Sequence, residues 1–283
     1  MTSALARKKI REMLAEDLGL GDVTSEAIVQ PKIRVNAEII TKQAGVLAGV
    51  AEATMVFEET GVKVRALKSD GADIKAGDVI IRLEGPAQGI LAAERVALNL
   101  LMRMSGIATA TRELIDLARR KNSKVVIAAT RKTAPLLTYF DKRAVVVAGG
   151  EPHRYRLSDR VLIKDNHLRL VGSVVEAVRR ARKVARRAKV EVEVGKPEEV
   201  LVAAKAGADT VMLDNMKPAD IKRAIRLLER EGLRSRVLLE ASGRIDTSNV
   251  GDFAAAGVDI ISSSYMTMRA PALDMSLEVR AKV

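Results

Sequence analysis

Short runs of β-branched residues alternate with helical segments between residues 124 and 261. Strands that are regularly followed by helices predict a parallel sheet with right-handed crossover connections. The expected strands are residues 124–129, 161–163, 190–194, 210–213, 237–239 and 258–261, and the helices between them include residues 172–187, 197–206, 218–231 and 247–256. Either an open, doubly wound sheet or a barrel fits this alternation.

Polar side chains stand at the carboxyl end of almost every expected strand. In a barrel all of these ends meet on one face, where barrel enzymes place their active sites. In an open sheet only the ends beside the switch point would meet. The polar groups are Thr130, Arg131, Lys132, Lys164, Asp165, Asn166, His167, Glu193, Asp214, Asn215, Glu240, Ser242, Ser262, Ser263 and Ser264. Their presence at so many strand ends favours the barrel. No Gly-x-Gly-x-x-Gly or Walker loop occurs, which argues against a dinucleotide or P-loop site.

The first part of the chain, to about residue 105, predicts a separate mixed α/β unit. Residues 4–18 repeat apolar side chains at helical spacing, and residues 35–40, 62–67 and 79–83 read as strands. Residues 88–120 are rich in helix-forming side chains, and we expect an interruption around Ser105 and Gly106.

Composition narrows the class of protein. The 283 residues are 48% hydrophobic and 30% charged, which excludes a largely disordered chain. No stretch of about 18 uncharged apolar residues occurs, so we expect no membrane span. The charged first segment lacks an apolar secretory core, which predicts a cytoplasmic protein. The absence of cysteine excludes disulfides and thiolate chemistry, and two histidines argue against a multi-histidine zinc site.

The net charge of +12 has two interpretations, a nucleic-acid surface or attraction of small polyanions. Only 2% of the residues are aromatic, so platforms for base stacking are nearly absent. The densest basic segment, residues 174–189, repeats apolar residues at helical spacing and predicts an amphipathic helix with a basic, solvated face. A non-enzymatic nucleic-acid-binding protein remains an alternative, although the strand-end carboxylates would repel phosphates unless a metal ion were present.

The strand-end residues and one nearby turn divide by the sign of their charge. The cationic or potentially cationic residues are Arg131, Lys132, His153, Arg154 and Lys164, and the carboxylates are Glu193, Asp214 and Glu240. Arginine and lysine suit carboxylate and phosphate groups, and carboxylates can hold Mg²⁺ directly or through its waters. Each residue taken singly also has a structural interpretation, such as a surface turn or an ion pair between Lys164 and Asp165. Their joint placement predicts a site for a polyanionic substrate and a divalent metal ion.

These residues lie in motifs that resemble the quinolinate phosphoribosyltransferase family. The motifs are Thr-Arg-Lys-Thr at 130–133, His-Arg at 153–154, Lys-Asp-Asn-His at 164–167, Glu-Val-Glu-Val at 191–194, Leu-Asp-Asn at 213–215 and Glu-Ala-Ser-Gly at 240–243, together with segments 15–25, 94–99 and 105–111. They follow the family's order and span nearly the whole chain. The resemblance implies an N-terminal α/β sandwich domain at residues 1–106, joined by residues 270–283. It also implies an incomplete, open α/β barrel of parallel strands at residues 107–269.

The resemblance also implies an activity and a set of site residues. The reaction transfers phosphoribosyl from phosphoribosyl pyrophosphate to quinolinate, with loss of pyrophosphate and CO2, and gives nicotinate mononucleotide for NAD biosynthesis. The residues that match the quinolinate pocket are Arg95, Arg131, His153, Arg154 and Lys164, and those that match the phosphoribosyl pyrophosphate side are Lys132, Glu193, Asp214, Ser242, Gly243 and Ser264. Lys132, Glu193, Asp214 and Lys164 are the expected catalytic residues, and Glu193 and Asp214 would hold Mg²⁺.

The family resemblance implies a homodimer or a higher homo-oligomer with shared active sites, in which Arg95 serves a neighbouring subunit. Neither a nucleic acid nor a membrane is an expected partner.

Four positions depart from the family pattern. A usual glycine and arginine are Leu136 and Thr138, and a phosphate-contacting glycine and a usual histidine are Ser264 and Met268. These departures keep a related paralogue as an alternative, the transferase-like protein of molybdenum-transport operons, which acts on another acceptor. That paralogue usually lacks the Lys-Asp-Asn-His motif that is present here at 164–167.

Overall fold

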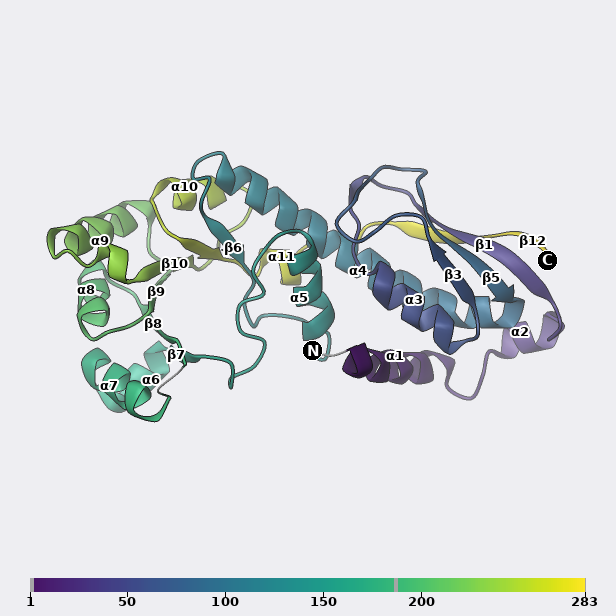
Figure 1. Cartoon of the computed structure of the whole chain (residues 1–283), viewed down its shortest axis with the longest axis horizontal. Coiled ribbons are helices and arrows are strands. Elements are labelled where there is room, and N and C mark those ends of the chain that lie inside the picture. The colour runs from purple at the N-terminus through teal and green to yellow at the C-terminus, as the bar shows by residue number, and fades with distance from the viewer. Residues whose placement is uncertain (1–2, 186–187, 283) are drawn as a thin grey trace. The chain divides into compact units, whose positions relative to one another are not determined.

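The computed structural model describes residues 3–185 and 188–282. Contacts divide the chain into two units, and Figure 1 colours them along the sequence. The first unit comprises Met1–Ala110, Ala134–Ala148 and Ala270–Val283, and the second comprises Thr111–Thr133 and Gly149–Arg269. None of the helices within the described residues has the length and apolar character needed to span a membrane.

The first unit is built on an antiparallel sheet with the strand order β12-β1-β5-β3. Its strands are β1 (Arg34–Thr41), β3 (Lys63–Ala66), β5 (Val79–Pro86) and β12 (Met275–Lys282), and a small second sheet pairs β2 (Gly45–Val46) with β4 (Asp73–Ile74). The helices wholly inside this unit are α1 (Ser3–Leu18), α2 (Val23–Ile28), α3 (Val50–Glu59) and α5 (Thr138–Val147). Val35, Ala37 and Ile39 are buried at alternate positions of β1, so one face of the sheet packs into the core. The C-terminal strand β12 pairs antiparallel with β1.

Helix α5 lies in the range that the family resemblance implies for the barrel, but it groups with the first unit. Two ion pairs explain this placement. The buried carboxylate of Asp141 accepts hydrogen bonds from Arg103 at 2.7 and 2.8 Å, and Arg143 pairs with Glu52 at 2.6 Å. All four residues belong to the first unit, so α5 is fixed to its core by charge as well as by packing.

The helix α4 (Ala87–Arg119) is continuous, and the expected interruption around Ser105 and Gly106 is wrong. The small residues there serve packing rather than a break in the helix. The Ser105 hydroxyl accepts the N–H of Ala48 at 3.0 Å and donates to the Ala48 carbonyl at 3.1 Å. A Cβ at Gly106 would lie 2.1 Å from the carbonyl oxygen of Pro271, so only glycine admits this close approach of the backbone.

The second unit is built on a six-stranded sheet with the order β6-β11-β10-β9-β8-β7, and every neighbouring pair is parallel. The strands are β6 (Val126–Ala128), β7 (Val161–Ile163), β8 (Val190–Val194), β9 (Thr210–Asp214), β10 (Leu238–Ser242) and β11 (Ile260–Ser262). Strands β7 to β11 are neighbours in chain order, and β6 continues the series beyond β11. A doubly wound sheet would reverse its order at a switch point. The continuous order is that of a barrel, which in the described residues stays open between β6 and β7.

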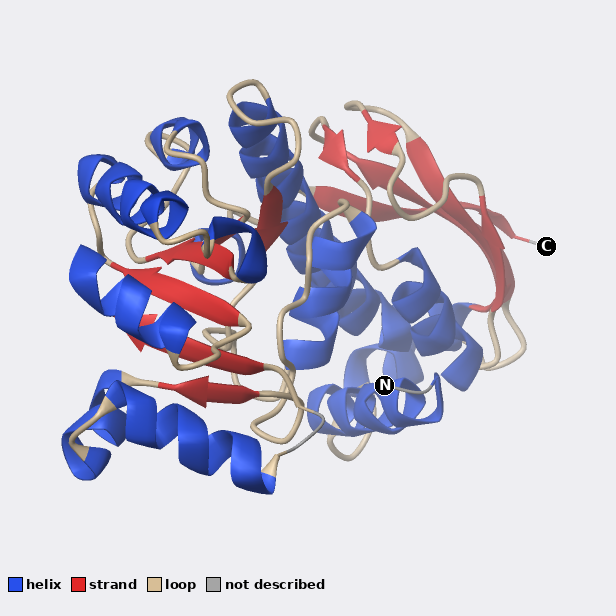
Figure 2. Cartoon of the chain, turned by 60° about the vertical axis from the view of Figure 1, so that its left-hand side comes forward, coloured by secondary structure: helices blue, strands red, loops and turns tan. Residues whose placement is uncertain are grey.

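Helices connect the strands and cover one side of this sheet, as Figure 2 shows. They are α6 (Asp165–Val171), α7 (Val174–Val184), α8 (Pro197–Lys205), α9 (Pro218–Arg230) and α10 (Val250–Ala255), with a 3₁₀ turn at Arg234–Arg236, and the short helix α11 (Tyr265–Met268) follows the last strand. The amphipathic character predicted for residues 174–189 holds in α7, where Ala177 and Val178 are buried and Arg179 and Arg180 pair with Glu176. Arg186 and Arg187 lie outside the described residues.

Two aspartates fasten neighbouring strands of the sheet in the same way. The carboxylate of Asp209, just before β9, accepts the N–H of Val190 at 2.7 Å and a bond from Arg182 at 2.7 Å. Burial alone would raise the pKa of Asp209, but the Val190 N–H and Arg182 outweigh burial and lower it. Asp259, just before β11, repeats the arrangement with the N–H of Leu239 and the guanidinium of Arg234. These bonds fix the register of the strands whose opposite ends carry the polar residues.

Candidate active site

The register of the parallel strands places the strand-end residues in two layers on one face of the sheet. Glu193, Met212 and Glu240 are paired across β8, β9 and β10. Asp214, Ser242 and Ser262 are paired one step closer to the carboxyl ends. Since paired residues of parallel strands point to the same side, these side chains share the face opposite the buried Val192, Leu213 and Ala241. This arrangement gives the sheet a polar inner face.

A pocket of about 330 Å³ opens above this polar face. It is lined by Ala129, Thr130, Arg131, Lys132, His153, Arg154, Leu162, Lys164, Glu193, Met212, Asp214, Asn215, Glu240, Ser242 and Ser262. The structure therefore brings most of the candidate residues of the second unit to one cavity. Larger cavities occur elsewhere on the protein, but this one gathers the predicted cations and carboxylates.

Lys164 stands between the two sets of charges. It follows β7 directly, and its Nζ lies 3.4 Å from a carboxylate oxygen of Glu193 on β8. The structural interpretation of an ion pair between Lys164 and Asp165 is wrong, because Asp165 pairs with Arg169 at 3.5 Å. The backbone N–H of Lys164 donates to His167 Nδ1 at 2.9 Å, and this capping interaction starts helix α6. His167 therefore has a structural role here.

The turn after β9 packs against the turn after β10. Asn215 has a left-handed backbone with φ of 51°, and its side chain donates to Asp214 at 2.9 Å. Gly243 has φ of 109°, and a Cβ there would lie 2.4 Å from the Asn215 side-chain oxygen. Any other residue at 243 would displace Asn215, so the two turns form one rigid rim beside Ser242. Sequence reasoning did not include Asn215 among the site residues, although its left-handed turn directly follows Asp214.

The backbone of Lys132 is hydrogen-bonded to Thr267, which lies near the C-terminal end of the second unit. Its carbonyl oxygen accepts a hydrogen bond of 2.7 Å from the hydroxyl of Thr267, and its N–H donates to Thr130 at 3.0 Å. Thr267 belongs to α11, for which Ser264 is the N-cap residue. Met268, at the position of a usual family histidine, is 57% exposed. Although Ser264 and Met268 depart from the family pattern, Thr267 between them still bonds to the backbone of Lys132. Ser264 and Gly243 do not line the pocket.

His153 and Arg154 enter the pocket from the turn before β7. His153 has a left-handed backbone with φ of 53°, and its Nδ1 receives the N–H of Arg154 at 2.8 Å. Its Nε2 lies close to carboxylate oxygens of Glu191 and Glu240. Burial disfavours the charged imidazole, but the two carboxylates outweigh burial and raise the pKa of His153 to about 9, whereas the Arg154 N–H at Nδ1 opposes the charged form. Arg154 is only 6% exposed, and burial together with the charge of Arg131 lowers its pKa.

Three positions of interest lie in the first unit. Arg95 is on α4, has a side chain that is 58% exposed, and lies 4.0 Å from Glu94. Leu136 stands where the family usually has glycine, and it adopts φ of 65°, a left-handed conformation that glycine would accept without strain. Thr138, the other departure, begins helix α5. The predicted contact of Arg95 with a neighbouring subunit stays a prediction.

The chemistry of Glu193 and Asp214 fits a magnesium ion that shares its ligands with a substrate. The two carboxylates come from neighbouring strands and line the same pocket. Mg²⁺ usually keeps several waters and binds through one or two carboxylates plus substrate phosphates, so two protein carboxylates suffice. Within the described residues, the one group of three possible metal ligands is His153, Glu191 and Glu240, which lies below this pair.

Two family descriptions match the chain. "Quinolinate phosphoribosyl transferase, N-terminal domain" covers residues 22–105, and "Quinolinate phosphoribosyl transferase, C-terminal domain" covers residues 107–278. A curated relative from Methanothermobacter thermautotrophicus, named probable nicotinate-nucleotide pyrophosphorylase (carboxylating), is 47% identical over 96% of this chain and 98% of its own length. The Homo sapiens nicotinate-nucleotide pyrophosphorylase (carboxylating) is 38% identical over 87% of this chain and 82% of its own length. The solved nicotinate-nucleotide pyrophosphorylase of Francisella tularensis has a TM-score of 0.92 at 36% identity, covering 99% of this chain and 98% of that chain.

Proposed function

The chain belongs to the quinolinate phosphoribosyltransferase family, and we propose that the pocket at the strand ends of its second unit is where it carries out that family's reaction. The protein is a pentosyltransferase of NAD biosynthesis. It transfers phosphoribosyl from phosphoribosyl pyrophosphate to quinolinate and forms nicotinate mononucleotide, pyrophosphate and CO2. The comparisons support neither the paralogue of molybdenum-transport operons nor a nucleic-acid-binding protein.

The acid side of the pocket is assigned to Arg131, His153, Arg154 and Lys164. The observation that carries the assignment is that all four line one small cavity whose cations outnumber those a single carboxylate would need. Quinolinate has two adjacent carboxylates, and arginine can bind such groups in a bidentate manner. Arg95 of a second subunit would complete this side, which makes the active unit a homodimer or a larger homo-oligomer.

The phosphoribosyl side is assigned to Lys132, Glu193, Asp214 and Ser242, which line the pocket, and the roles of Gly243 and Ser264 beside it stay predictions of the family resemblance. Lys132 supplies positive charge to a phosphate, and the rigid rim of Asn215 and Gly243 offers backbone groups beside Ser242. Glu193 and Asp214 would hold Mg²⁺ directly or through its waters. The bound ion supplies neutralising charge for the pyrophosphate that leaves.

In the first step the ring nitrogen of quinolinate forms a bond to C1 of the ribose, and the bond from C1 to pyrophosphate breaks. The anionic carboxylates near the ribose stabilise the positive charge that develops on its ring in an oxocarbenium-like transition state. In the second step the C2 carboxylate leaves as CO2, its bonding electrons stay on C2, and a proton takes its place. Arg131, Arg154 and Lys164 orient the dicarboxylate throughout, so the protein needs no covalent nucleophile.

The test is the release of CO2 and pyrophosphate by the purified protein. With phosphoribosyl pyrophosphate and quinolinate we expect both products in equal amounts, and removal of Mg²⁺ by a chelator should abolish both. Replacement of Arg131 by alanine should abolish turnover with the protein still folded. Product release that survives this substitution would refute the assigned pocket.

The compartment proposed for the reaction is the cytoplasm, which fractionation of cells that make the protein would test.

A further inference from the structure

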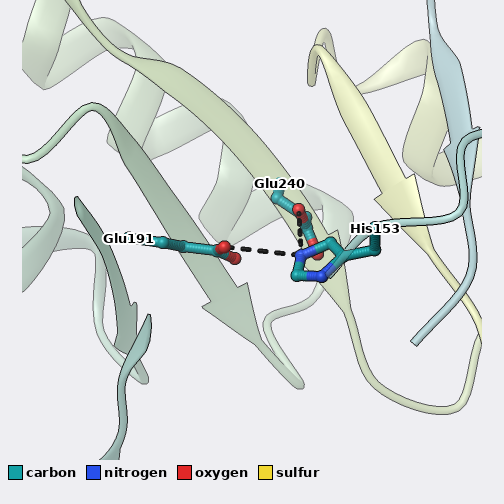
Figure 3. A group of neighbouring side chains, drawn as sticks. All are labelled: His153, Glu191 and Glu240. Carbon is teal, nitrogen blue, oxygen red and sulfur yellow. Dashed lines mark ion pairs between the residues drawn. The ribbon is translucent and has the colours of Figure 1, made fainter. Parts of the chain in front are cut away.

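Two buried carboxylates beneath His153, at the floor of the pocket, have no part in the assignments above. Figure 3 shows the cluster of three side chains, His153, Glu191 and Glu240. His153 Nε2 lies 3.4 Å from Glu191 and 3.5 Å from Glu240, and the side chains are 6%, 2% and 0% exposed. Neither carboxylate has a hydrogen-bond partner elsewhere in the part of the chain that the structure describes. Burying two carboxylates around a single imidazole costs free energy. Their presence here therefore points to a function.

The cluster joins two strands that are not neighbours in the sheet. Glu191 lies on β8 and Glu240 on β10, and β9 runs between them. In a flat sheet two strands separated by a third are about 9.5 Å apart, twice the usual strand spacing. Both carboxylates nevertheless reach the same ring nitrogen, because their side chains extend from the two strands toward the imidazole (Figure 3).

The hydrogen bond at Nδ1 determines which ring nitrogen of His153 carries the proton. Nδ1 faces the N–H of Arg154 at 2.8 Å, so in the neutral ring the proton is on Nε2. The charged ring would carry a second proton on Nδ1, which would oppose the Arg154 N–H, so this contact favours the neutral ring with Nε2–H directed at the carboxylates. A metal ion bound at Nε2 would require the proton to move to Nδ1, where it would oppose the Arg154 N–H. The geometry therefore favours a proton between these groups over a metal ion.

Packing alone does not hold the imidazole in place. A second cavity, of about 570 Å³, lies at the amino ends of the strands, and His153 and Glu240 line both this cavity and the active-site pocket. The ring thus has open space on the side away from the pocket. The left-handed backbone of His153 is also intrinsically unfavourable for a residue other than glycine. The contacts of the ring nitrogens oppose its rotation into the second cavity.

We propose that Glu191 and Glu240 are positioning residues for the dicarboxylate substrate. Their carboxylates accept a hydrogen bond from the Nε2–H of His153. This interaction holds the turn of His153 and Arg154 with both side chains facing the pocket. This inference rests on the proposed function, because it assumes that these two side chains bind quinolinate. The carboxylates of Glu191 and Glu240 are buried and directed at His153, so we expect their effect to pass through His153.

Paired substitutions separate a positioning role from a merely structural one. Glu191→Met and Glu240→Met remove the acceptor at similar length, and Glu191→Gln and Glu240→Gln retain an acceptor oxygen. We expect each Met variant to raise the KM for quinolinate at least about tenfold, the scale of one hydrogen bond to a charged group, with the KM for phosphoribosyl pyrophosphate unchanged. The Gln variants should stay within about threefold of the parent enzyme. In a His153→Ala background, Glu191→Met should have no further effect on the KM.

Thr210→Val is the matched control, because Thr210 pairs with Glu191 in the sheet and is also buried. It should leave the KM for quinolinate unchanged. Folded Met variants that bind quinolinate as the parent enzyme does would overturn the inference. A parent enzyme that fails to convert quinolinate would instead overturn the proposed function, so the two failures are distinguishable.

A measurement on the unmodified protein covers the case in which the Met variants do not fold. The chain has two histidines, so nitrogen NMR of the labelled imidazoles gives two sets of signals, which His167→Gln assigns. We expect a proton on His153 Nε2 that exchanges slowly with water. A proton-free Nε2, or one that exchanges as fast as a surface imidazole, would overturn the inference.

Discussion

The ammonium nitrogen of Lys164 lies 3.4 Å from a carboxylate oxygen of Glu193, across the boundary between the predicted acid side and the predicted phosphoribosyl side of the pocket. The Lys164 side chain is 46% exposed, and ion pairs of such exposure contribute at most about 1 kcal/mol to stability. The pair is therefore weak enough to be exchanged. A substrate carboxylate can replace Glu193 as the partner of Lys164, which would release Glu193 to act near the ribose.

Replacement of Lys132 tests the phosphoribosyl side alone. Lys132→Ala removes a positive charge from the pocket, while Thr267 bonds only to the backbone of residue 132 and keeps that contact. We expect the KM for phosphoribosyl pyrophosphate to rise about 10- to 100-fold, the scale for losing a charge-assisted contact to phosphate. The preference for quinolinate over nicotinate should not change. An unchanged KM for phosphoribosyl pyrophosphate would remove Lys132 from the site.

Mixing two inactive variants tests the shared active site. An Arg95→Ala chain and an Arg131→Ala chain each lack one part of the acid side. If Arg95 serves the neighbouring subunit, a mixed dimer contains one intact site and one site that lacks both arginines. Random exchange between equal amounts should then restore about a quarter of the parent activity. Mixed dimers that are shown to form and yet remain inactive would argue against the exchange of Arg95 between subunits.

The strand-fastening role of Asp209 predicts a dependence of stability on pH. Its pKa is lowered in the folded protein, so the carboxylate stabilises the fold above the ordinary value of 3.8, and this contribution is lost as the pH falls through the lowered pKa. Near neutral pH, Asp209→Asn should reduce the free energy of unfolding by about 1–2 kcal/mol. Urea unfolding should show this difference shrinking below about pH 4. A difference that stays constant down to about pH 2 would contradict the assigned role.

The success of sequence reasoning depended on whether the information was local. Strand 190–194 and its alternating glutamates follow from a period of two, and the structure has this strand at Val190–Val194. The break expected at Gly106 failed because the backbone at Pro271, far along the chain, requires a residue without a side chain there. The meeting of Glu191 and Glu240 at the imidazole of His153 could not be predicted either. It depends on a turn and two strands that are far apart in the sequence, and no spacing within one strand records those contacts.

Substrate choice is the sharpest test of the acid side. Nicotinate has one carboxylate, whereas the pocket gathers Arg131, His153, Arg154 and Lys164, and Arg95 of a second subunit is expected to join them. Binding nicotinate would leave some of these cations without a partner in a closed site, which costs several kcal/mol. We therefore expect kcat/KM for nicotinate to be lower by roughly 10³-fold or more. Lys164→Ala should lower quinolinate turnover sharply and narrow that ratio, because the variant loses the cation that the second carboxylate needs. Competition assays that measure CO2 and pyrophosphate together would decide the matter. Equal use of the two acids by the parent enzyme, or unchanged quinolinate kinetics in Lys164→Ala, would show that the pocket does not recognise a dicarboxylate.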